Sequence, residues 1–454
     1  MLLLYYLIFP SSAMEYLYET GCPVCRISRQ LPHSRHGHQK MLYVLDLCYI
    51  GLIISDKSLD PVSYIFPAMK THRRQNSLKT QAVLLTAIKA LYQSIIEGLG
   101  LKISLEEDFK IIRKNFLAKI GRDYAASRGE FLNGKIMAEY LGYTFIDAAE
   151  VVFFDEEGNF DAEKTDEVLT AKLADIERAV IPGFYGSEPD GSVKTFSRGG
   201  SDITGSIVAK AVHAEMYENW TDVSGFLITD PRIIPNPKPI DVITYRELRE
   251  LSYMGATVLH EDAIFPVRKE GIPINIRNTN APEDKGTLIV EATCQKPRFV
   301  ITGIAGKKDF ASVTVEKAMM NSQVGFCRKV LEVFEENHVS IEHMPSGIDT
   351  MTIFVHQEEF EEKEQKVIAG IHREVEPDYL ELESDLALIA VVGRGMRATR
   401  GTSGRIFSAL AHANINVRMI DQGSSELNII IGVSNHDFEG AIKAIYDIFV
   451  TTQI

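Results

Sequence analysis

The chain has 454 residues, of which 45% are hydrophobic and 24% are charged, and this predicts a globular protein of two or three domains. A formal net charge of −14 argues against nucleic-acid binding, which requires a basic surface. Five scattered cysteines provide no disulfide framework, so a reducing cytoplasm is expected. No stretch reaches the roughly 20 apolar residues of a membrane span, so no membrane partner is expected.

The N-terminal segment, residues 1–80, carries two weak signals. The apolar start MLLLYYLIFP is barely long enough for a signal peptide and lacks the positive charge that precedes one. A CxxC pair is followed by three histidines, which superficially resembles a metal site. The spacing is too short for a zinc finger and no second CxxC follows, so no structural metal is expected. The residues concerned are Cys22, Cys25, His33, His36 and His38.

From about residue 80, the chain alternates between helical and strand patterns. Apolar residues recur at helical spacing in two segments, and short apolar runs between Gly and Pro turns are typical of buried strands. Helices are expected at 83–97 and 129–141, and strands at 143–146, 179–181 and 225–228. Such alternation predicts an α/β layered domain at residues 81–292.

The C-terminal third contains one pattern twice. Residues 312–356 and residues 386–433 both read strand, helix, strand, strand, and an amphipathic helix follows each. Each βαββα unit needs one more strand to complete a small antiparallel sheet. The first unit can use residues 379–383, whereas little chain remains after the second.

The apolar run at residues 299–304 can supply the strand that the second unit lacks. We therefore expect two interleaved ferredoxin-like (βαββαβ) modules, the first inserted into the second. The first would span residues 311–385, and the second residues 298–310 and 386–454. A short terminal strand at residues 450–454 is the alternative.

The densest candidate site is the motif FSRGGSD, which precedes the helical run TGSIVAKAV. Gly199 and Gly200 permit close backbone approach and a positive φ, and Ser201 or Asp202 can cap the helix. The free N–H groups at the helix N-terminus can bind an anion, and Arg198 can hold a carboxylate by two hydrogen bonds. A plain glycine turn with a helix cap is the alternative interpretation.

Two polar loops and one carboxylate are further candidates. The sequences TDVSG, which begins at Thr221, and TDPR, which begins at Thr229, are typical of loops that line ligand crevices in α/β folds. Two ordinary turns are the alternative. Glu130 precedes an amphipathic helix, where a carboxylate compensates the helix dipole or holds a substrate ammonium.

In this order and spacing, the motifs resemble the aspartate kinases, members of the amino-acid kinase family with C-terminal ACT domains. The strongest pieces are PGFYG, FSRGGSD, WTDVSG with TDPR, SYMGATVLHEDAIFPV and IDQGSSELN, and the resemblance runs from about residue 120 to the C-terminus. It implies an amino-acid-kinase-like α/β sandwich followed by the two ACT domains. The implied reaction transfers the γ-phosphoryl group of ATP to the side-chain carboxylate of L-aspartate, the first step toward lysine, threonine and methionine. A sibling kinase for glutamate or acetylglutamate is disfavoured by the tandem ACT region.

The resemblance also implies roles for individual residues. Arg198 and Glu130 would bind the α-carboxylate and α-ammonium of aspartate, with Ser201 and Phe184 beside them, and Asp202 would organise the transfer centre. ATP and Mg²⁺ are the implied cofactors, with Mg²⁺ bridging the phosphates. The residues expected around the nucleotide are Thr221, Asp222, Gly225, Asp230 and Arg232.

This reaction would not need a histidine. Both reactants are anions, and the attacking carboxylate is already ionised at neutral pH. Catalysis then consists of positioning and charge neutralisation, without a general base. His260, which lies in the SYMGATVLH sequence, is therefore expected to be structural.

The ACT modules imply feedback control by an end-product amino acid, lysine or threonine. Glu342 would bind the effector's ammonium while backbone N–H groups bind its carboxylate. For Met320 and Phe326, the alternative is that they are core residues. The residues expected to line the effector pockets are Met320, Phe326, Ser340 and Glu342 in the first module, and Gln422 and Asn428 in the second. ACT sheets pair across subunits, so a homodimer or homotetramer is expected.

The opening segment departs from the family. Aspartate kinases begin with a strand that leads into a Lys-Phe-Gly-Gly-Ser-Ser loop, whose lysine contacts the transferring phosphate. Residues 41–54 read MLYVLDLCYIGLII, which predicts a strand without that loop. Losing such a lysine commonly costs several kcal/mol of transition-state stabilisation. A catalytically impaired regulatory homologue is therefore the alternative function, and a frame error or a decayed gene start would explain residues 1–80.

Overall fold

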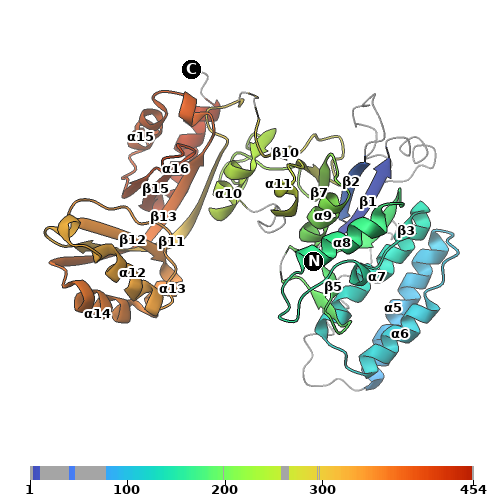
Figure 1. Ribbon diagram of the computed structural model, residues 1–454. Coiled ribbons are helices and arrows are strands. Elements are labelled where there is room, and N and C mark those ends of the chain that lie inside the picture. The colour runs from blue at the N-terminus through green and yellow to red at the C-terminus, as the bar shows by residue number, and fades with distance from the viewer. Residues whose placement is uncertain are drawn as a thin grey trace. The chain divides into compact units, whose positions relative to one another are not determined.

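The computed structural model forms two compact units (Figure 1). Unit 1 comprises Met1–Phe226 and Leu259–Glu291, and unit 2 comprises Leu227–Val258 and Ala292–Ile454. The structure describes residues 4–10, 40–46, 78–197, 199–256, 265–293, 295 and 297–451. Within these ranges, no helix is long and apolar enough to cross a membrane. The CxxC pair, its histidines, Arg198 and His260 lie outside the described residues.

Unit 1 is built on a mixed sheet whose strands run in the order β3-β4-β1-β2-β7-β9-β10. The strands are β1 (Leu4–Pro10), β2 (Lys40–Asp46), β3 (Thr144–Phe145), β4 (Ala179–Pro182), β7 (Tyr217–Thr221), β9 (Ile274–Asn278) and β10 (Thr287–Val290). The neighbours β2, β7 and β9 are parallel, whereas β1 is antiparallel to both β2 and β4. Parallel strands bring their carboxyl ends to one edge of a sheet, which is where ligand crevices form in α/β folds.

Two groups of helices accompany this sheet. The helices α5 (Leu78–Gly98), α6 (Glu106–Leu117) and α7 (Arg122–Leu141) pack together, and they share an apolar core that contains Ile88, Tyr92 and Phe109. The second group is α8 (Ala162–Leu173), α9 (Gly200–Ala211) and α11 (Phe265–Lys269), with α9 against β1 and β7. Small buried residues such as Gly205 and Ala209 let α9 approach the sheet closely.

Most of the local predictions for unit 1 are confirmed. The helices expected at 83–97 and 129–141 lie inside α5 and α7, and the strands expected at 143–146 and 179–181 are β3 and β4. The strand expected at 225–228 is wrong, because this segment forms bends and a single bridge between Leu227 and Pro239. The short elements η3 (Ala148–Glu150), β5 (Tyr185–Ser187) and β6 (Val193–Thr195) complete the unit.

Unit 2 contains β8 (Val242–Thr244) and α10 (Tyr245–Tyr253), followed by the C-terminal sheet β12-β11-β13-β15-β14. Its strands are β11 (Gly303–Glu316), β12 (Thr350–His356), β13 (Tyr379–Val392), β14 (Met419–Asp421) and β15 (Asn428–Ser434). Its helices are α12 (Phe326–Glu336), α13 (Gln357–Glu361), α14 (Glu364–Val375), α15 (Thr402–His412) and α16 (Phe438–Tyr446). Short helical turns occur at Met320–Ser322, Met396–Ala398, Asn435–Asp437 and Asp447–Thr451.

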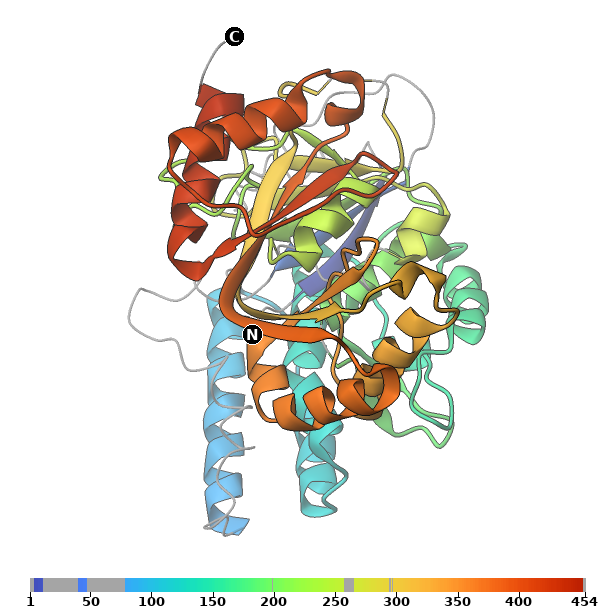
Figure 2. The same ribbon diagram turned by 90° about the vertical axis from the view of Figure 1, so that its left-hand side faces the viewer.

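Two long strands run through both halves of this sheet. The start of β11 pairs with the end of β13 (Gly303 opposite Val392), and the end of β11 pairs with the start of β13 (Glu316 opposite Tyr379). The register shifts between Lys307 and Phe310, which bends the pair. Figure 2 shows β13 as one curved ribbon that passes from one half to the other.

The strands that had been expected separately at 299–304 and from 312 are therefore one strand, which begins only at Gly303. The second strand expected in the first repeat is reduced to bridges from His343 and Ser346. Val450 and Thr451 end a helical turn rather than a terminal strand.

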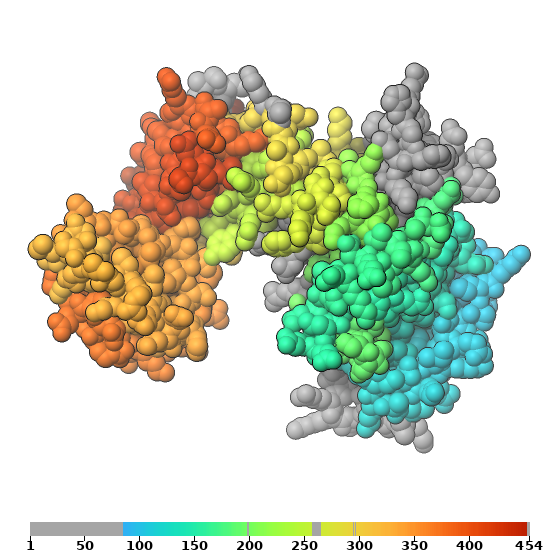
Figure 3. All heavy atoms as spheres, in the orientation of Figure 1, coloured from blue at the N-terminus to red at the C-terminus, as the bar shows by residue number. Residues whose placement is uncertain are grey.

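Each half of the C-terminal sheet carries its own helices and core, so the halves form separate lobes (Figure 3). In the first half, α12 packs on α14 through Val330, Val333 and Ile371. A cysteine in α12, Cys327, is exposed. In the second half, α15 packs on α16. Between the lobes, His343 Nδ1 lies 3.2 Å from Asp421 Oδ2.

Candidate functional site

The FSRGGSD turn brings two backbone segments into close contact at the start of α9. Gly199 has a left-handed φ of 56° and α9 begins at Gly200. A Cβ added at Gly200 would lie 2.7 Å from Phe196 Cβ and 2.9 Å from Phe184 Cβ, closer than real side chains approach. The predicted close approach and positive φ are confirmed. The predicted cap is wrong, because Ser201 and Asp202 lie inside the first turn and no side chain caps the helix.

Asp202 faces the central strand β7. Its Oδ1 accepts a hydrogen bond of 2.8 Å from Asn219 Nδ2, and its backbone carbonyl accepts one of 3.3 Å from the Tyr217 hydroxyl. Burial, with the nearby charge of Asp202, raises the pKa of Tyr217 well above its ordinary value. Asn219 therefore holds the carboxylate of Asp202, and Tyr217 holds its backbone.

Phe184 is fixed beside the same helix start in an unusual conformation. Its φ is 63°, a region that costs a non-glycine residue of order 1–3 kcal/mol and is concentrated at functional sites. Its N–H donates to Thr204 Oγ1 at 3.1 Å, and that hydroxyl donates to the Gly200 carbonyl at 2.8 Å. The structure thus brings together Phe184, Ser201 and Asp202.

Glu130 lies in the middle of α7 and is only 2% exposed. The prediction that it precedes a helix and compensates the helix dipole is therefore wrong. Its charge reaches Tyr92 and Tyr185, whose pKa values are raised chiefly by burial and further by this carboxylate. Arg128, which sequence reasoning missed, is also buried, with its guanidinium 4.5 Å from the ring centres of Tyr124 and Phe131.

Tyr185 follows Phe184 directly, and its hydroxyl donates to Asp147 Oδ1 at 2.7 Å. The Arg128 guanidinium on α7 lies 5.5 Å from the centre of the Tyr185 ring, so Tyr185 links α7 to Phe184 and the start of α9. The signal for Arg128 was its place in the same SRGE sequence as Glu130.

The TDVSG sequence forms a polar loop at the carboxyl ends of β7 and β9. The Thr221 carbonyl accepts from the N–H and the hydroxyl of Thr279 at 2.8 and 2.9 Å, and the Thr221 hydroxyl donates to Asp222 Oδ1 at 3.3 Å. Ser224 donates to Asp284 Oδ2 at 2.6 Å and accepts from Asn278 Nδ2 at 2.9 Å. The sequence reasoning missed Ser224, although it lies within the motif.

A buried ion pair lies on the opposite face of β7. Arg277 Nη1 lies 3.6 Å from Glu218 Oε1, and Trp220 Nε1 donates to Glu218 Oε2 at 3.1 Å. Burial raises the pKa of Glu218 to about 7, despite the opposing effects of Arg277 and Trp220. Arg277 also donates to the Pro282 carbonyl at 2.7 Å. This pair supports β7 and β9 from behind the polar loop.

Gly225 ends the polar loop at a position that has no room for a side chain, which gives a testable prediction. Its φ is +89°, and an added Cβ would overlap Thr287 Oγ1 and lie 2.6 Å from the Thr287 nitrogen. That hydroxyl accepts the Phe226 N–H at 2.8 Å. Gly225→Ala is therefore expected to lower the free energy of unfolding of unit 1 by about 2–4 kcal/mol, measured by urea denaturation with Trp220 fluorescence. The matched control is Gly191→Ala, which has a φ of +83° in open space and should cost only about 1 kcal/mol of backbone strain. Equal losses in the two variants would contradict the steric argument.

The TDPR sequence belongs to unit 2. Asp230 accepts hydrogen bonds from Arg232 of 3.0 Å from Nε, 2.6 Å from Nη2 and 2.8 Å from the backbone N–H, and these bonds hold the pKa of Asp230 below its ordinary value. The structure therefore brings Asp230 and Arg232 together, in a different unit from Thr221, Asp222 and Gly225.

The six residues expected in effector pockets have different environments. Met320 and Phe326 are buried in the core of the first lobe, which was their alternative role. Ser340 and Gln422 are exposed. Glu342 and Asn428 both bond to α10: Tyr253 donates to Glu342 Oε2 at 2.6 Å, and Asn428 Nδ2 donates to Glu250 Oε2 at 2.5 Å.

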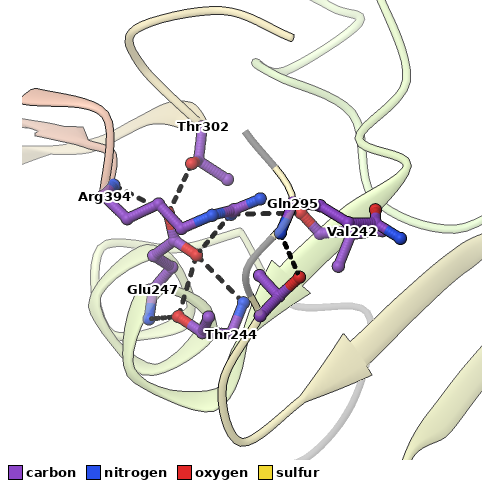
Figure 4. Close-up of polar contacts among 7 residues, drawn as sticks. Val242, Thr244, Glu247, Gln295, Thr302 and Arg394 are labelled. Carbon is purple, nitrogen blue, oxygen red and sulfur yellow. Dashed lines mark hydrogen bonds and ion pairs between the residues drawn. The ribbon is translucent and has the colours of Figure 1, made fainter. Parts of the chain in front are cut away.

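Unit 2 also contains a buried carboxylate that sequence reasoning missed (Figure 4). Glu247 is fully buried, and its Oε1 accepts from the Thr302 hydroxyl at 2.5 Å and the Arg394 N–H at 2.8 Å. Its Oε2 accepts from Arg394 Nη1 at 2.9 Å and from the N–H and hydroxyl of Thr244 at 2.9 and 2.8 Å. With Thr244 it forms the capping box of α10, which the T-x-x-E spacing in the sequence could have signalled.

Two cavities among the described residues lie away from the predicted site residues. One of about 140 Å³ is lined by Asp241, Arg298, Arg394 and their neighbours in unit 2. Another of about 280 Å³ is lined by Lys135, Glu139, Tyr143 and neighbours in unit 1. No group of three or more His, Cys, Asp or Glu side chains among the described residues could hold a metal ion.

Comparisons with known proteins agree with this architecture. Residues 59–278 match the amino acid kinase family and residues 389–449 match an ACT domain, so the expected fold class is confirmed. Aspartokinase 3 of Bacillus subtilis is 39% identical over 336 residues, which cover 72% of this chain and 74% of the relative. Chloroplastic aspartokinase 1 of Arabidopsis thaliana is 30% identical over 72% of this chain and 60% of its own length.

Solved structures show the same relationship. The aspartate kinase of Clostridium acetobutylicum superposes with a TM-score of 0.77 and 49% identity, covering 87% of this chain and 91% of that one. Aspartokinase III of Escherichia coli, in complex with aspartate and ADP, has a TM-score of 0.61 over 85% of this chain and 90% of that one, and at 22% identity it shows the fold alone. The chain belongs to the aspartokinase family.

Proposed function

We propose that this chain is an aspartate kinase, which transfers the γ-phosphoryl group of ATP to the side-chain carboxylate of L-aspartate. The observation that carries the proposal is the start of α9, where Gly200 packs against Phe184 and Asp202 is held by Asn219 and Tyr217. A helix N-terminus with free N–H groups attracts an anion. The relatives named aspartokinases and the aspartate and ADP in the Escherichia coli structure agree with this assignment.

The substrate aspartate would lie between α7 and the start of α9. Glu130 would hold its ammonium and Arg198 its α-carboxylate, with Ser201 and Phe184 beside them. Buried Glu130 suits this role, because a buried carboxylate is strongly stabilised when a cation binds beside it.

The nucleotide would lie at the carboxyl ends of β7 and β9. Thr221, Asp222 and Gly225 line this edge in unit 1. Carboxylate oxygens are the ligands that Mg²⁺ prefers, so Asp202 or Asp222 would hold a magnesium ion, which would neutralise phosphate charge when bound. The chain's own groups then position two anions and stabilise the charge of the transition state.

The alternative function, a catalytically impaired regulatory homologue, rests on the N-terminal segment. β2 lies in the sheet parallel to β7, with Val44 opposite Asn219. Its carboxyl end at Asp46 therefore reaches the same edge as Thr221, where the family carries its lysine loop. The residues that follow, 47–77, are outside the described part of the chain, and their sequence contains no Lys-Phe-Gly-Gly-Ser-Ser segment.

An acyl-phosphate assay separates the two functions. With Mg-ATP and hydroxylamine, the purified protein is expected to form aspartyl hydroxamate with L-aspartate and none with L-glutamate. The rate should be several powers of ten below that of a loop-bearing relative, because a transition-state lysine is lost. Rates like those of such a relative would contradict the argument from the missing lysine. No hydroxamate, together with binding of an amino acid by the ACT modules, would support the regulatory alternative.

The ACT modules would bind lysine or threonine as a feedback effector, in a homodimer or homotetramer. Glu342 is the carboxylate proposed for the effector's ammonium. The Escherichia coli relative has been solved with lysine and aspartate, which supports this kind of ligand for the fold.

A further inference from the structure

The helix α10 belongs to the kinase part of the sequence but packs with the ACT modules. Its residues fall within the 59–278 match to the amino acid kinase family, whereas it clusters in unit 2 against β11 and β13. A Cβ added at Gly303 in β11 would lie 2.6 Å from Leu251 Cδ1, so the helix and strand are in close contact.

One face of α10 carries three polar links to the ACT segments. Glu247, Glu250 and Tyr253 are spaced three residues apart, which places them along one side of a helix. Their partners are Thr302 and Arg394 for Glu247, Asn428 for Glu250, and Glu342 for Tyr253. Two of these partners, Asn428 and Glu342, are proposed effector residues. The helix therefore contacts both candidate effector regions directly.

The link at Tyr253 uses the same carboxylate that the effector would need. Glu342 Oε2 accepts from the Tyr253 hydroxyl at 2.6 Å, and Oε1 lies 3.2 Å from His356 Nε2. Burial and the Glu342 carboxylate raise the pKa of Tyr253 to about 12, so the hydroxyl is a donor at neutral pH. The Glu342 side chain is 9% exposed, and both of its oxygens already have partners.

We propose that Tyr253 and the effector's ammonium compete for Glu342, so that effector binding releases the C-terminal end of α10 from the ACT sheet. This inference rests on the proposed function, because it assumes an amino-acid effector at Glu342. The hydrogen bond from Tyr253 stabilises the effector-free, active arrangement. Since coupling between two sites is reciprocal, removing this bond favours effector binding and lowers the activity that remains without effector.

Calorimetric titration of the full-length protein with lysine and, separately, with threonine tests the link. Tyr253→Phe keeps the ring beside Lys307, whose Nζ lies 5.4 Å from the ring centre, and removes only the hydroxyl. Its dissociation constant for the effector is expected to fall about three- to tenfold, as loss of one competing hydrogen bond predicts. The control Tyr379→Phe removes the hydroxyl of an exposed tyrosine in β13 and should leave the constant unchanged.

Hydrogen exchange gives a second readout that a merely structural role would not change. Effector binding is expected to speed amide exchange at the C-terminal end of α10 in the wild-type protein, and to have little further effect in Tyr253→Phe. If the wild-type protein binds lysine or threonine and Tyr253→Phe binds it within twofold of the same constant, the link is overturned and the proposed function stands. If the wild-type protein binds neither amino acid, the proposed regulation and this inference are both overturned.

Discussion

Replacing Asp202 with asparagine is expected to lower the kcat of aspartyl phosphate formation by about 10²- to 10³-fold, the usual loss when one preorganised charged group is removed from a transition state. Asparagine keeps the oxygen that accepts the 2.8 Å hydrogen bond from Asn219, so the start of α9 should retain its geometry. Only the negative charge, proposed to organise magnesium and the transferring phosphate, is lost. Hydroxamate trapping under saturating Mg-ATP and aspartate measures the effect.

A carboxylate that bonds to the other end of α9 provides a matched control. Asp166 in α8 accepts a hydrogen bond of 3.1 Å from Lys210 in α9, away from the helix start. Asp166→Asn removes one carboxylate from a neighbour of α9 and should leave kcat within about twofold, because a partly exposed ion pair contributes little. A rise confined to the KM for aspartate in Asp202→Asn, with kcat unchanged, would assign Asp202 to substrate binding. An unchanged kcat and KM would remove Asp202 from the site.

Local rules of backbone chemistry explain which parts of the site could be predicted from the sequence. Gly199 and Gly200 beside a small-residue helix allow few conformations other than a tight turn with a close approach, and the structure has that turn. The cap was wrong because the left-handed Gly199 itself ends the turn, so the helix starts one residue before Ser201. A helix boundary depends on one φ angle, which composition does not determine.

Long-range partners explain what could not be predicted. The capping box of Thr244 and Glu247 is visible locally, yet Glu247 also bonds Thr302 and Arg394, which lie 55 and 147 residues away. Met320 and Phe326 are apolar, and the sequence is equally compatible with a pocket wall and a core. In the structure, both side chains are buried among other apolar residues and belong to the core. The merging of predicted strands into β11 has the same origin, because strand length follows from pairing along β13.

Arg394→Met is expected to destabilise unit 2 by about 3–5 kcal/mol, the usual cost of leaving a buried charge without its partner. Arg394 Nη1 lies 2.9 Å from Glu247 Oε2, and the Glu247 side chain has no exposed surface. Methionine fills much of the same space, so the loss reports the charge. Amide exchange in α10 should accelerate by about 10²- to 10³-fold, since 1.4 kcal/mol corresponds to a factor of ten. Trp220, the one tryptophan of the sequence, lies in unit 1, and its fluorescence should be unchanged.

The pH dependence of this loss separates charge from packing. Burial alone would raise the pKa of Glu247, but hydrogen bonds from Thr302, Arg394 and Thr244, with the charge of Arg394, hold the pKa below its ordinary value. In the wild-type protein, Glu247 therefore contributes stability that is complete above the ordinary carboxyl pKa and is lost as pH falls through the depressed one. Without Arg394, burial raises the pKa of Glu247, and the carboxyl takes up a proton on acidification.

The difference in stability between Arg394→Met and the wild type should therefore be largest near pH 8 and shrink toward about pH 4.5, where the neutral carboxyl no longer needs a cation. Arg397→Met, which removes an exposed arginine three residues along the chain, should stay within about 0.5 kcal/mol of the wild type at every pH. A loss in Arg394→Met that does not change across this range would mean that the side chain stabilises unit 2 by packing. Glu247 would then keep its charge through the hydroxyl and N–H donors of Thr302 and Thr244 alone.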